Sequence, residues 1–215
     1  GSTGGPVSAV NPNMLKNSDF LTSAFAAEYG NAIGVVFDLG FRKGNKDNYE
    51  ITLQAGAFTG LEAMAEGPMG KNNGSFLVSG RYSLVGLIGA GAGGASVATP
   101  NYTDLSFNFD LGNTSWGNFS IFGIIGDSDI DFLADEVDEE DLFAAEDEDL
   151  FVRSGFGVIG LKHQISIGKS SYLRSVLSGS LSESQITSNR YINKDTEQER
   201  VILFSETENN ENRLS

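Results

Sequence analysis

Cysteine is absent from this chain of 215 residues, histidine occurs once, and proline occurs only four times. Without cysteine there is no disulfide framework, no thiolate metal site and no thiol nucleophile. One histidine leaves few routes to a Ser–His–Asp triad or to a metal site with several histidine ligands. Basic residues are also scarce, with 14 Lys+Arg against 29 Asp+Glu and a net charge of −15. Phosphate contacts need a basic face, so the sequence predicts no nucleic-acid partner.

An opening secretory signal and a convincing apolar helix are missing as well. Residues 1–13 show no basic start followed by an apolar stretch. The stretch 82–103 has 22 residues without charge, but five glycines and Pro100 make it a poor helix, so we expect a strand end and a loop there. Glycine, in contrast, is abundant at 27 residues, beside 40% apolar residues. This composition is too apolar for a disordered chain and suggests many strands joined by tight turns.

Alternation of apolar and polar residues with a period of two is the strongest pattern. In 104–111, apolar side chains at odd positions alternate with polar side chains at even positions. Similar alternation runs through 49–57, 76–84, 159–167 and, more sparsely, 173–181. Successive side chains of a strand point to opposite faces, so each stretch predicts a strand with one apolar and one polar face. No stretch of comparable length shows a convincing helical period, and the predicted fold class is all-β and antiparallel.

Short and long connections alternate between these predicted strands. The short turns, at 70–74, 112–117 and 168–171, all begin with glycine. The long polar connections are 86–101, 131–149 and 188–199. This order places all short turns at one end of the sheet and all long loops at the other, which is the layout of a transmembrane β-barrel. A soluble sandwich can also alternate its connections, but it does not need this regular segregation.

Residues 1–45 follow a different pattern. We expect a helical turn in 11–16, short strands in 19–25 and 32–41, and a polar, turn-rich link in 44–48. The predicted domain boundary falls in this link, which gives domains at 1–45 and 46–215.

Several short runs in the N-terminal region resemble one known family. The runs are 4–11, 18–20 and 27–34. They resemble the C-terminal half of the plug domain in TonB-dependent outer-membrane receptors, and the AEYGN motif at 27–31 with the following FDL at 37–39 is similar to the Bacteroidetes type. Further along, 62–68, 75–83 and 127–131 are similar to parts of the family's barrel strands. Val35 departs from the pattern, because the family commonly has a second glycine there.

The resemblance implies a plugged barrel of about 22 strands in the outer membrane of a Gram-negative bacterium. Strand and connection together take ~20 residues, so 46–215 would supply roughly eight strands. The chain is therefore expected to be a fragment, with the end of a plug, the first third of a barrel and no TonB-contacting segment. The implied function is uptake of a scarce extracellular nutrient with energy from TonB, without a cofactor and without chemistry on the substrate. The expected partners are outer-membrane lipid, TonB and an unknown nutrient ligand, which the long loops would bind.

The resemblance also yields candidate site residues. The plug motif and gate would comprise Glu28, Tyr29, Gly30, Asn31 and Arg42. Charges on the inner wall of a plugged barrel must meet water or partners on the plug, so we expect ion pairs between the two. The expected inner-wall partners are Glu50, Glu62, Glu66 and Arg81. The side chains expected to face lipid include Phe107, Phe109, Phe119, Ile121 and Leu161.

An acidic stretch supports an alternative hypothesis. From 127 to 149 there are 13 acidic residues and no basic residue. Asp127, Asp129 and Asp131 have the opening spacing of a calcium loop, but Phe132 stands where that loop needs glycine. The alternative function is a soluble or surface β-domain that binds calcium or a basic partner through 127–149. A solvated outer loop, extended by repulsion between its charges, is the simpler interpretation of the same stretch.

Two glycine patterns carry a third hypothesis, an enzyme with a dinucleotide site. The glycines at 155, 157 and 160 match the fingerprint, as do those at 89, 91 and 94. The fingerprint needs a strand before it and a helix after it. Residues 161–167 alternate as a strand and Pro100 breaks the second candidate, so we expect glycines that pack in a strand and in a loop. No enzyme is predicted, and His163 is expected to be structural or interfacial.

Overall fold

The structure of the protein is a computed structural model that describes residues 11–16, 19–21, 36–38, 40–56, 60–83, 101–132, 148–192 and 200–214. This part of the chain is all-β, as predicted, and its one helical element is a 3-10 turn, η1 (Pro12–Met14). Within these ranges, no helix has the length and apolarity needed to cross a membrane.

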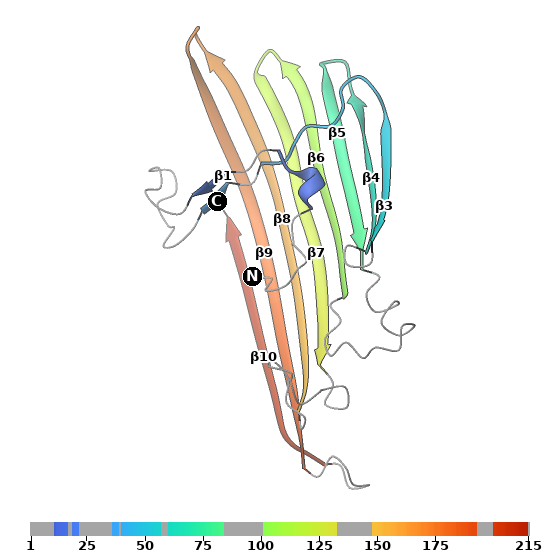
Figure 1. Cartoon of the computed structure of the whole chain (residues 1–215). Helices are drawn as coiled ribbons and strands as arrows, with labels where there is room; N and C mark the ends of the chain where they lie inside the picture. Colours follow the sequence, from blue (N-terminus) through green and yellow to red (C-terminus); the bar gives the residue numbers. More distant parts are fainter. Residues whose placement is uncertain are drawn as a thin grey trace.

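Eight strands form one antiparallel sheet in which each strand pairs with its neighbours in sequence (Figure 1). The strands are β3 (Glu50–Gly56), β4 (Gly60–Met69), β5 (Gly74–Tyr82), β6 (Asn101–Thr114), β7 (Gly117–Phe132), β8 (Glu148–Ile167), β9 (Ser171–Ile192) and β10 (Arg200–Leu214). Their order across the sheet is β10-β9-β8-β7-β6-β5-β4-β3. The prediction of roughly eight antiparallel strands after residue 45 is confirmed.

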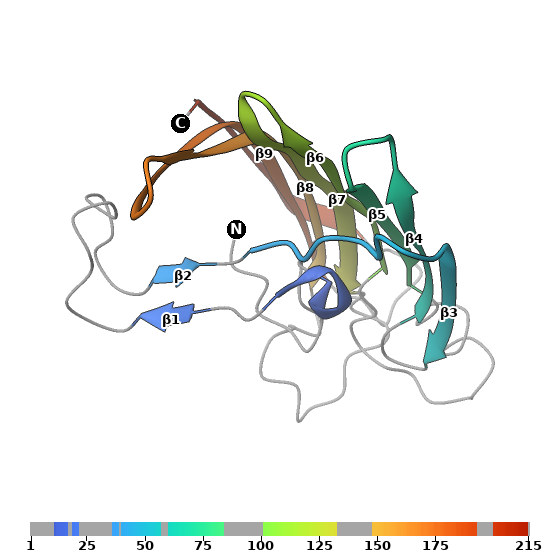
Figure 2. The same ribbon diagram turned by 90° about the horizontal axis from the view of Figure 1, so that it is seen from above.

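The sheet is a single curved layer and not a closed barrel (Figure 2). Its edge strands β3 and β10 do not pair with each other in the described residues. The N-terminal elements lie on the concave side: η1, the stretch 40–48, and a separate antiparallel pair, β1 (Asp19–Leu21) with β2 (Val36–Asp38). We call the concave side the inner face and the convex side the outer face.

The described short connections all lie at one end of the sheet, as predicted (Figure 1). They are the turns at 70–73, 115–116 and 168–170. Gly112, just before the second turn, has φ +76°, and a Cβ there would lie 2.0 Å from the Asn72 carbonyl oxygen. Glycine is needed because it alone tolerates both this conformation and this approach. The register shift in β6 beside Gly112 lets the Asn113 N–H donate to the Asn72 oxygen at 2.9 Å, which ties two turns together.

Three strands extend beyond their predicted ends. β7 ends only at Phe132, β8 already begins at Glu148, and β9 ends only at Ile192. The predictions of loops across all of 131–149 and 188–199 were therefore wrong at their margins, where backbone pairing continues. Acidic and polar side chains suggested loops there, but alternate residues still supply apolar cross-strand neighbours. The rest of the three long connections, 84–100, 133–147 and 193–199, lies outside the described residues.

The N-terminal predictions can be compared with the structure only in part, because residues 22–25, 32–35 and 39 lie outside the described ranges. The expected helical turn is η1, whose cap Asn11 accepts the Asn13 N–H on its side-chain oxygen at 2.9 Å. The strands expected over 19–25 and 32–41 are described only as the three-residue strands β1 and β2. The expected link 44–48 contains no strand, so the chain reaches β3 as irregular backbone.

The glycine pattern at 155–160 lies inside β8, which continues as a strand. The pattern therefore lacks the helix that a dinucleotide site needs. A Cβ on Gly160 would lie 2.3 Å from the Phe122 ring, so this glycine makes room for an aromatic neighbour. The second pattern, 89–94, lies outside the described residues.

His163 makes structural contacts, as expected from the sequence. Its ring stacks on Phe119 with the centroids 4.4 Å apart. Its Nε2 lies 2.7 Å from the carbonyl oxygen of Trp116 in the β6–β7 turn. The ring therefore connects β8 to the β6–β7 turn.

Candidate functional site

Polar residues are buried and large apolar residues are exposed in this sheet, which reverses the usual order of a water-soluble protein. In β6, Ser106 and Asp110 are fully buried, whereas Leu105 and Leu111 are 46% and 41% exposed. The buried polar side chains of β4, β5 and β6 are Glu62, Glu66, Ser75, Ser79, Arg81, Asp104, Ser106, Asn108 and Asp110. We call this set the polar wall. Its contacts with Asn11, Arg42 and Lys43 place it on the inner face. The ribbon of the N-terminal segment, by which we mean 11–16 and 40–48, runs along this face (Figure 2).

Glu62 on β4 is the first contact between the segment and the polar wall. Its Oε1 accepts from Asn11 Nδ2 at 2.6 Å, and its two oxygens accept from Asn13 Nδ2 at 3.2 and 3.1 Å. Asn11 Nδ2 also donates to Ser79 Oγ on β5 at 2.8 Å, and Ser79 Oγ donates to Glu62 at 3.2 Å. A buried carboxylate needs such donors to offset its lost hydration. Amide side chains thus fix η1 to two strands.

Glu66 on β4 is the second contact and forms a bidentate ion pair with Arg42. The Nη1 and Nη2 atoms of Arg42 donate to the two carboxylate oxygens at 2.8 and 2.7 Å. The Asn45 N–H donates to the same carboxylate at 2.7 Å, and Arg42 Nε donates to the Asn13 carbonyl oxygen at 2.8 Å. These hydrogen bonds to Glu66 raise the pKa of Arg42 above its ordinary value, against the opposing effect of burial. The parallel pair of bonds fixes direction as well as distance.

Asp110 on β6 is the third contact. Its Oδ2 lies 2.8 Å from Lys43 Nζ and 3.5 Å from Lys46 Nζ. Two residues earlier on the same face, Asn108 Nδ2 donates to the Arg42 carbonyl oxygen at 2.8 Å. The stretch 40–48 therefore crosses three strands of the sheet, with polar contacts to β4 and β6.

Apolar contact between the segment and the wall is small in comparison. The buried cluster consists of Met14 from η1 with Met64 and Leu77 from the sheet. Phe41 packs against this cluster, and its ring centroid lies 5.9 Å from that of Phe122. The segment is thus held mainly by hydrogen bonds and ion pairs.

Arg81 forms an ion pair within the polar wall itself. Its Nε and Nη2 atoms lie 2.8 and 2.7 Å from Asp104 Oδ2 on the adjacent strand β6. Its guanidinium carbon also lies 5.6 Å from the centre of the Tyr102 ring. The pair neutralises two buried charges next to each other, which is the condition for burying either of them.

The structure brings some of the predicted site residues together. Arg42 reaches Glu66, and two amides of the segment, not charges, reach Glu62. Glu50 is exposed and accepts from the Asn45 side chain at 2.5 Å. Arg81 pairs with a wall residue. The predicted gate residues at 28–31, Glu28, Tyr29, Gly30 and Asn31, lie outside the described residues.

Other residues of this interface were not predicted as site residues. Asn11 and Asn13 carry no charge, so the expectation of ion pairs between plug and wall did not include them. Lys46 lies in the polar link 44–48 and Lys43 directly precedes it, and the sequence assigned a partner to neither. Asp110 belongs to the polar row of 104–111, and that row was the available signal, because an inward carboxylate requires a partner.

The outer face carries a band of exposed apolar side chains, which we call the apolar band. Tyr49, just before β3, is 75% exposed, and Ile51 and Leu53 on β3 are 78% and 76% exposed. The band continues across the sheet through Leu61, Leu105, Ile125, Ile159, Leu161, Leu177 and Leu181. The residues expected to point outward share this face by strand alternation and register: Phe107, Phe109, Phe119, Ile121 and Leu161.

The outer face changes chemistry along the strands. On β7, Ile125 belongs to the apolar band, and Asp127, Asp129 and Asp131 follow it on the same face. Asp127 is in register with one residue on each of three other strands, and we call this row the boundary row: Thr103, Asp127, Gly155 and Glu183. On the inner face, apolar residues occur both before this row, as Phe122 and Ile124, and beyond it, as Ile130. The outer face of β7 and β9 thus changes from apolar to polar at the boundary row, while the inner face shows no matching change.

Comparison with known proteins adds no family. No protein-family model, no curated protein and no solved structure matches this chain. Within the described ranges, no group of three or more His, Cys, Asp or Glu side chains is placed to hold a metal ion. The function is therefore argued from the polar wall, the segment that covers it and the apolar band.

Proposed function

We propose that this chain is part of an outer-membrane receptor that takes up a scarce extracellular nutrient. In this proposal β3–β10 are a section of a transmembrane barrel wall, and the N-terminal segment is part of a plug inside it. Energy reaches the plug from TonB, and the nutrient passes without chemical change. The resemblance of 4–42 to plug domains motivates the TonB part of the proposal, and the geometry of the sheet supports the barrel part.

The inverted burial of the sheet carries the proposal. An outer face of exposed leucine, isoleucine and aromatic side chains is costly in water and favourable in hydrocarbon. The inner face of β4–β6, with its serines, amides and paired charges, suits a wet or plugged lumen. A water-soluble β-domain would instead bury its apolar rows between two layers, and the described strands form one layer.

The height of the apolar band also supports a membrane wall. From Gly117, the first residue of β7, to Gly126, just before the boundary row, the strand has ten residues. A tilted transmembrane strand needs about 9–11 residues to cross the hydrocarbon. The short turns at one end and the boundary row at the other would therefore mark the two edges of the bilayer.

The contacts of the segment support a plug that can leave the wall. Its buried apolar cluster is small, while its hydrogen bonds and ion pairs can be replaced by bonds to water. The net free energy of such polar contacts is only about 0.5–1.5 kcal/mol each, or ~1.5–3 kcal/mol with a charged partner. A plug held in this way can be displaced stepwise without exposing a large apolar core.

Two adjacent positions on β9 test the placement in the membrane. The chain has no cysteine, so Leu181→Cys and Ser180→Cys each create a unique labelling site. Leu181 belongs to the apolar band, and Ser180 lies on the opposite face. A fluorophore at 181 should be quenched by lipids with spin-labelled acyl chains, whereas one at 180 should be quenched only by a water-soluble quencher.

Equal behaviour of the two positions would contradict a membrane wall. If neither fluorophore responds to the lipid quencher and calcium raises the thermal stability, the alternative β-domain that binds calcium through 127–149 is favoured instead. Nutrient uptake has its own test in the native host. A strain without this gene should fail on the same limiting nutrient as a strain without TonB, and normal growth of the first strain on every nutrient that requires TonB would count against the receptor.

A further inference from the structure

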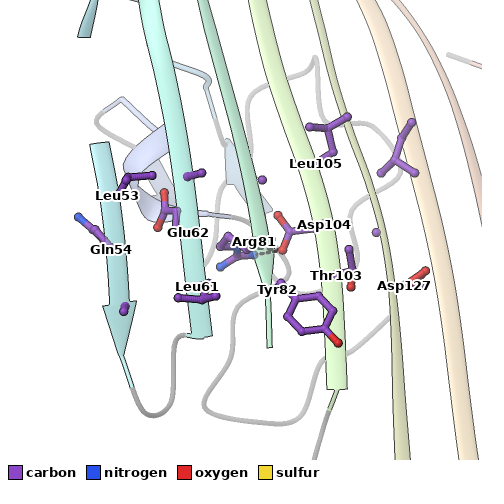
Figure 3. A pocket seen from close by; sticks show the side chains of 15 residues that line it. Leu53, Gln54, Leu61, Glu62, Arg81, Tyr82, Thr103, Asp104, Leu105 and Asp127 are labelled. Atoms are coloured by element: carbon purple, nitrogen blue, oxygen red, sulfur yellow. Dashed lines mark hydrogen bonds and ion pairs between the residues drawn. The ribbon is translucent and has the colours of Figure 1, made fainter. Parts of the chain in front are cut away.

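The polar wall contains more carboxylates than cations. Its charged members are the carboxylates of Glu62, Glu66, Asp104 and Asp110 and the guanidinium of Arg81. Glu62, Arg81 and Asp104 are register neighbours on β4, β5 and β6, and the close-up in Figure 3 shows this row with the ion pair between Arg81 and Asp104. One guanidinium cannot compensate four buried carboxylates, so the wall depends on cations and hydrogen-bond donors from outside it.

The N-terminal segment supplies cations at two of these carboxylates. The Arg42 guanidinium donates two parallel hydrogen bonds to Glu66 at 2.8 and 2.7 Å, and the Lys43 ammonium lies 2.8 Å from Asp110 Oδ2. A guanidinium fits a carboxylate in this way wherever it comes from, and an ammonium needs only an accessible oxygen. The segment therefore occupies a surface that is suited to ammonium and guanidinium groups in general.

The segment does not use every polar atom of this surface. Ser75 and Ser106 are fully buried, and among the described residues their Oγ atoms have no hydrogen-bond partner. The Oδ1 atom of Asp104, whose Oδ2 pairs with Arg81, is likewise buried and without a partner there. Ser75 is the register neighbour of Asp110, and Ser106 lies two residues beyond Asp104 on the same face. Buried acceptors left without a donor are costly, so a ligand with more N–H groups than the segment would satisfy more of the wall.

We propose that the nutrient carries ammonium or guanidinium groups, and that these groups replace Arg42 and Lys43 on the wall when the segment is displaced. The segment is then a competitor of the nutrient for the same carboxylates. A purely anionic nutrient would meet Glu62, Glu66 and Asp110 without their partners, and this repulsion disfavours it. The inference rests on the proposed function, because it requires the inner face to line the path of the nutrient.

Chemical rescue tests the recognition surface in the full-length receptor. Arg42→Gly removes the guanidinium from Glu66, so amide hydrogen exchange in 40–48 should accelerate. Free ethylguanidinium should slow this exchange several-fold, whereas ethylurea, which has a similar shape and no charge, should not. Glu66→Gln in the same background should abolish the rescue. Glu50→Gln is the matched control and should leave the rescue intact, because Glu50 is exposed and accepts from the Asn45 side chain instead.

Uptake by the native host tests the class of nutrient, with spermidine as the probe. Spermidine carries several ammonium groups, so it should inhibit uptake of the nutrient that requires this gene and raise the KM several-fold over that in NaCl of equal ionic strength. A strain with Glu62→Gln and Glu66→Gln should show a raised KM without spermidine and little further response to it. Glu183→Gln is the control for charge and should behave as the wild type, because Glu183 lies on the outer face in the boundary row.

The outcomes separate this inference from the proposed function. Rescue by ethylguanidinium no stronger than by ethylurea overturns the inference, and so does an equal response to spermidine in the wild type and the double variant. If Arg42→Gly does not fold, the uptake experiment decides alone. If either negative result occurs while the fluorophore at 181 still faces lipid and the gene is still required for a nutrient, the receptor stands and the nutrient class alone fails. If no nutrient requires the gene, both proposals fail together.

Discussion

Glu66 shows how single residues hold the N-terminal segment to the sheet. Three donors from the segment reach its carboxylate, two from Arg42 and one from the Asn45 backbone. Arg42 is only partly exposed and Glu66 is buried, so water can replace these bonds only when the segment moves away from the wall. Removing the negative charge would leave a guanidinium beside a neutral amide and would weaken all three bonds.

Glu66→Gln is therefore expected to loosen the segment. Hydrogen bonds with a charged partner contribute about 1.5–3 kcal/mol, and each ~1.4 kcal/mol is tenfold in population. Amide hydrogen exchange in 40–48 should accelerate by about ten- to a hundredfold, while exchange in the middle of β8 stays unchanged. Hydrogen exchange followed by mass spectrometry measures both regions in one experiment.

Glu50→Gln is the control for this prediction. Glu50 is exposed and accepts a hydrogen bond from the Asn45 side chain, so its neutralisation should change exchange in 40–48 only slightly. An equal effect of the two variants would mean that the segment responds to the total charge of the inner face and not to the pair of Arg42 with Glu66.

β7 shows most directly how the polarity of the outer face changes along a strand. Up to Ile125 its outer positions are apolar or glycine, and from Asp127 onward they are acidic. Its inner positions are apolar on both sides of this point, with Phe122 and Ile124 before it and Ile130 after it. The outer face of the strand therefore changes from a pattern suited to hydrocarbon to one suited to water.

Labelling along β7 tests this change of environment. In the membrane, Asp129→Cys should react with a water-soluble maleimide faster than Ile125→Cys, by on the order of tenfold or more, because the thiolate needs water to form. Arg153→Cys and Gly157→Cys on β8 lie at the same two levels and should repeat the difference. Similar rates at both levels would show that the bilayer does not end at the boundary row.

The open edges dominate the behaviour of the whole molecule. β3 and β10 leave one row of backbone donors and acceptors each without a strand partner in the described residues. Unpaired edges template association in water and are costly in lipid, so a sheet of this kind requires further strands. The proposed receptor would supply them by closing the barrel.

The 215-residue chain without further strands is expected to be unstable in water. In buffer without detergent it should form aggregates of broad size and should melt without a sharp transition, because both its edges and its apolar band associate. Size-exclusion chromatography with light scattering and a thermal scan measure these properties. A monodisperse monomer with one sharp transition would contradict both the open sheet and the membrane wall.

Alternation along 104–111 and the glycine-rich turns were enough to predict strands, faces and the grouping of short turns at one end. These are local properties, since the side-chain period and the turn conformation depend on neighbouring residues. The partners of the polar face were not local. Asn11 meets Glu62, 51 positions away in sequence, and Asn108 meets Arg42 across 66 positions. Only the curvature of the sheet and the path of the segment bring such groups within hydrogen-bond distance.

The ends of β7, β8 and β9 also could not be predicted from local sequence alone. Charge and polarity in the sequence suggested loops, while in the folded sheet the backbone ladder continues through those residues because each neighbouring strand offers a matching edge. Composition and periodicity thus specified a sheet with two unlike faces. Which face is covered, by which segment, and how far the strands run followed from contacts between distant parts of the chain, and such contacts depend on the packing of the complete sheet.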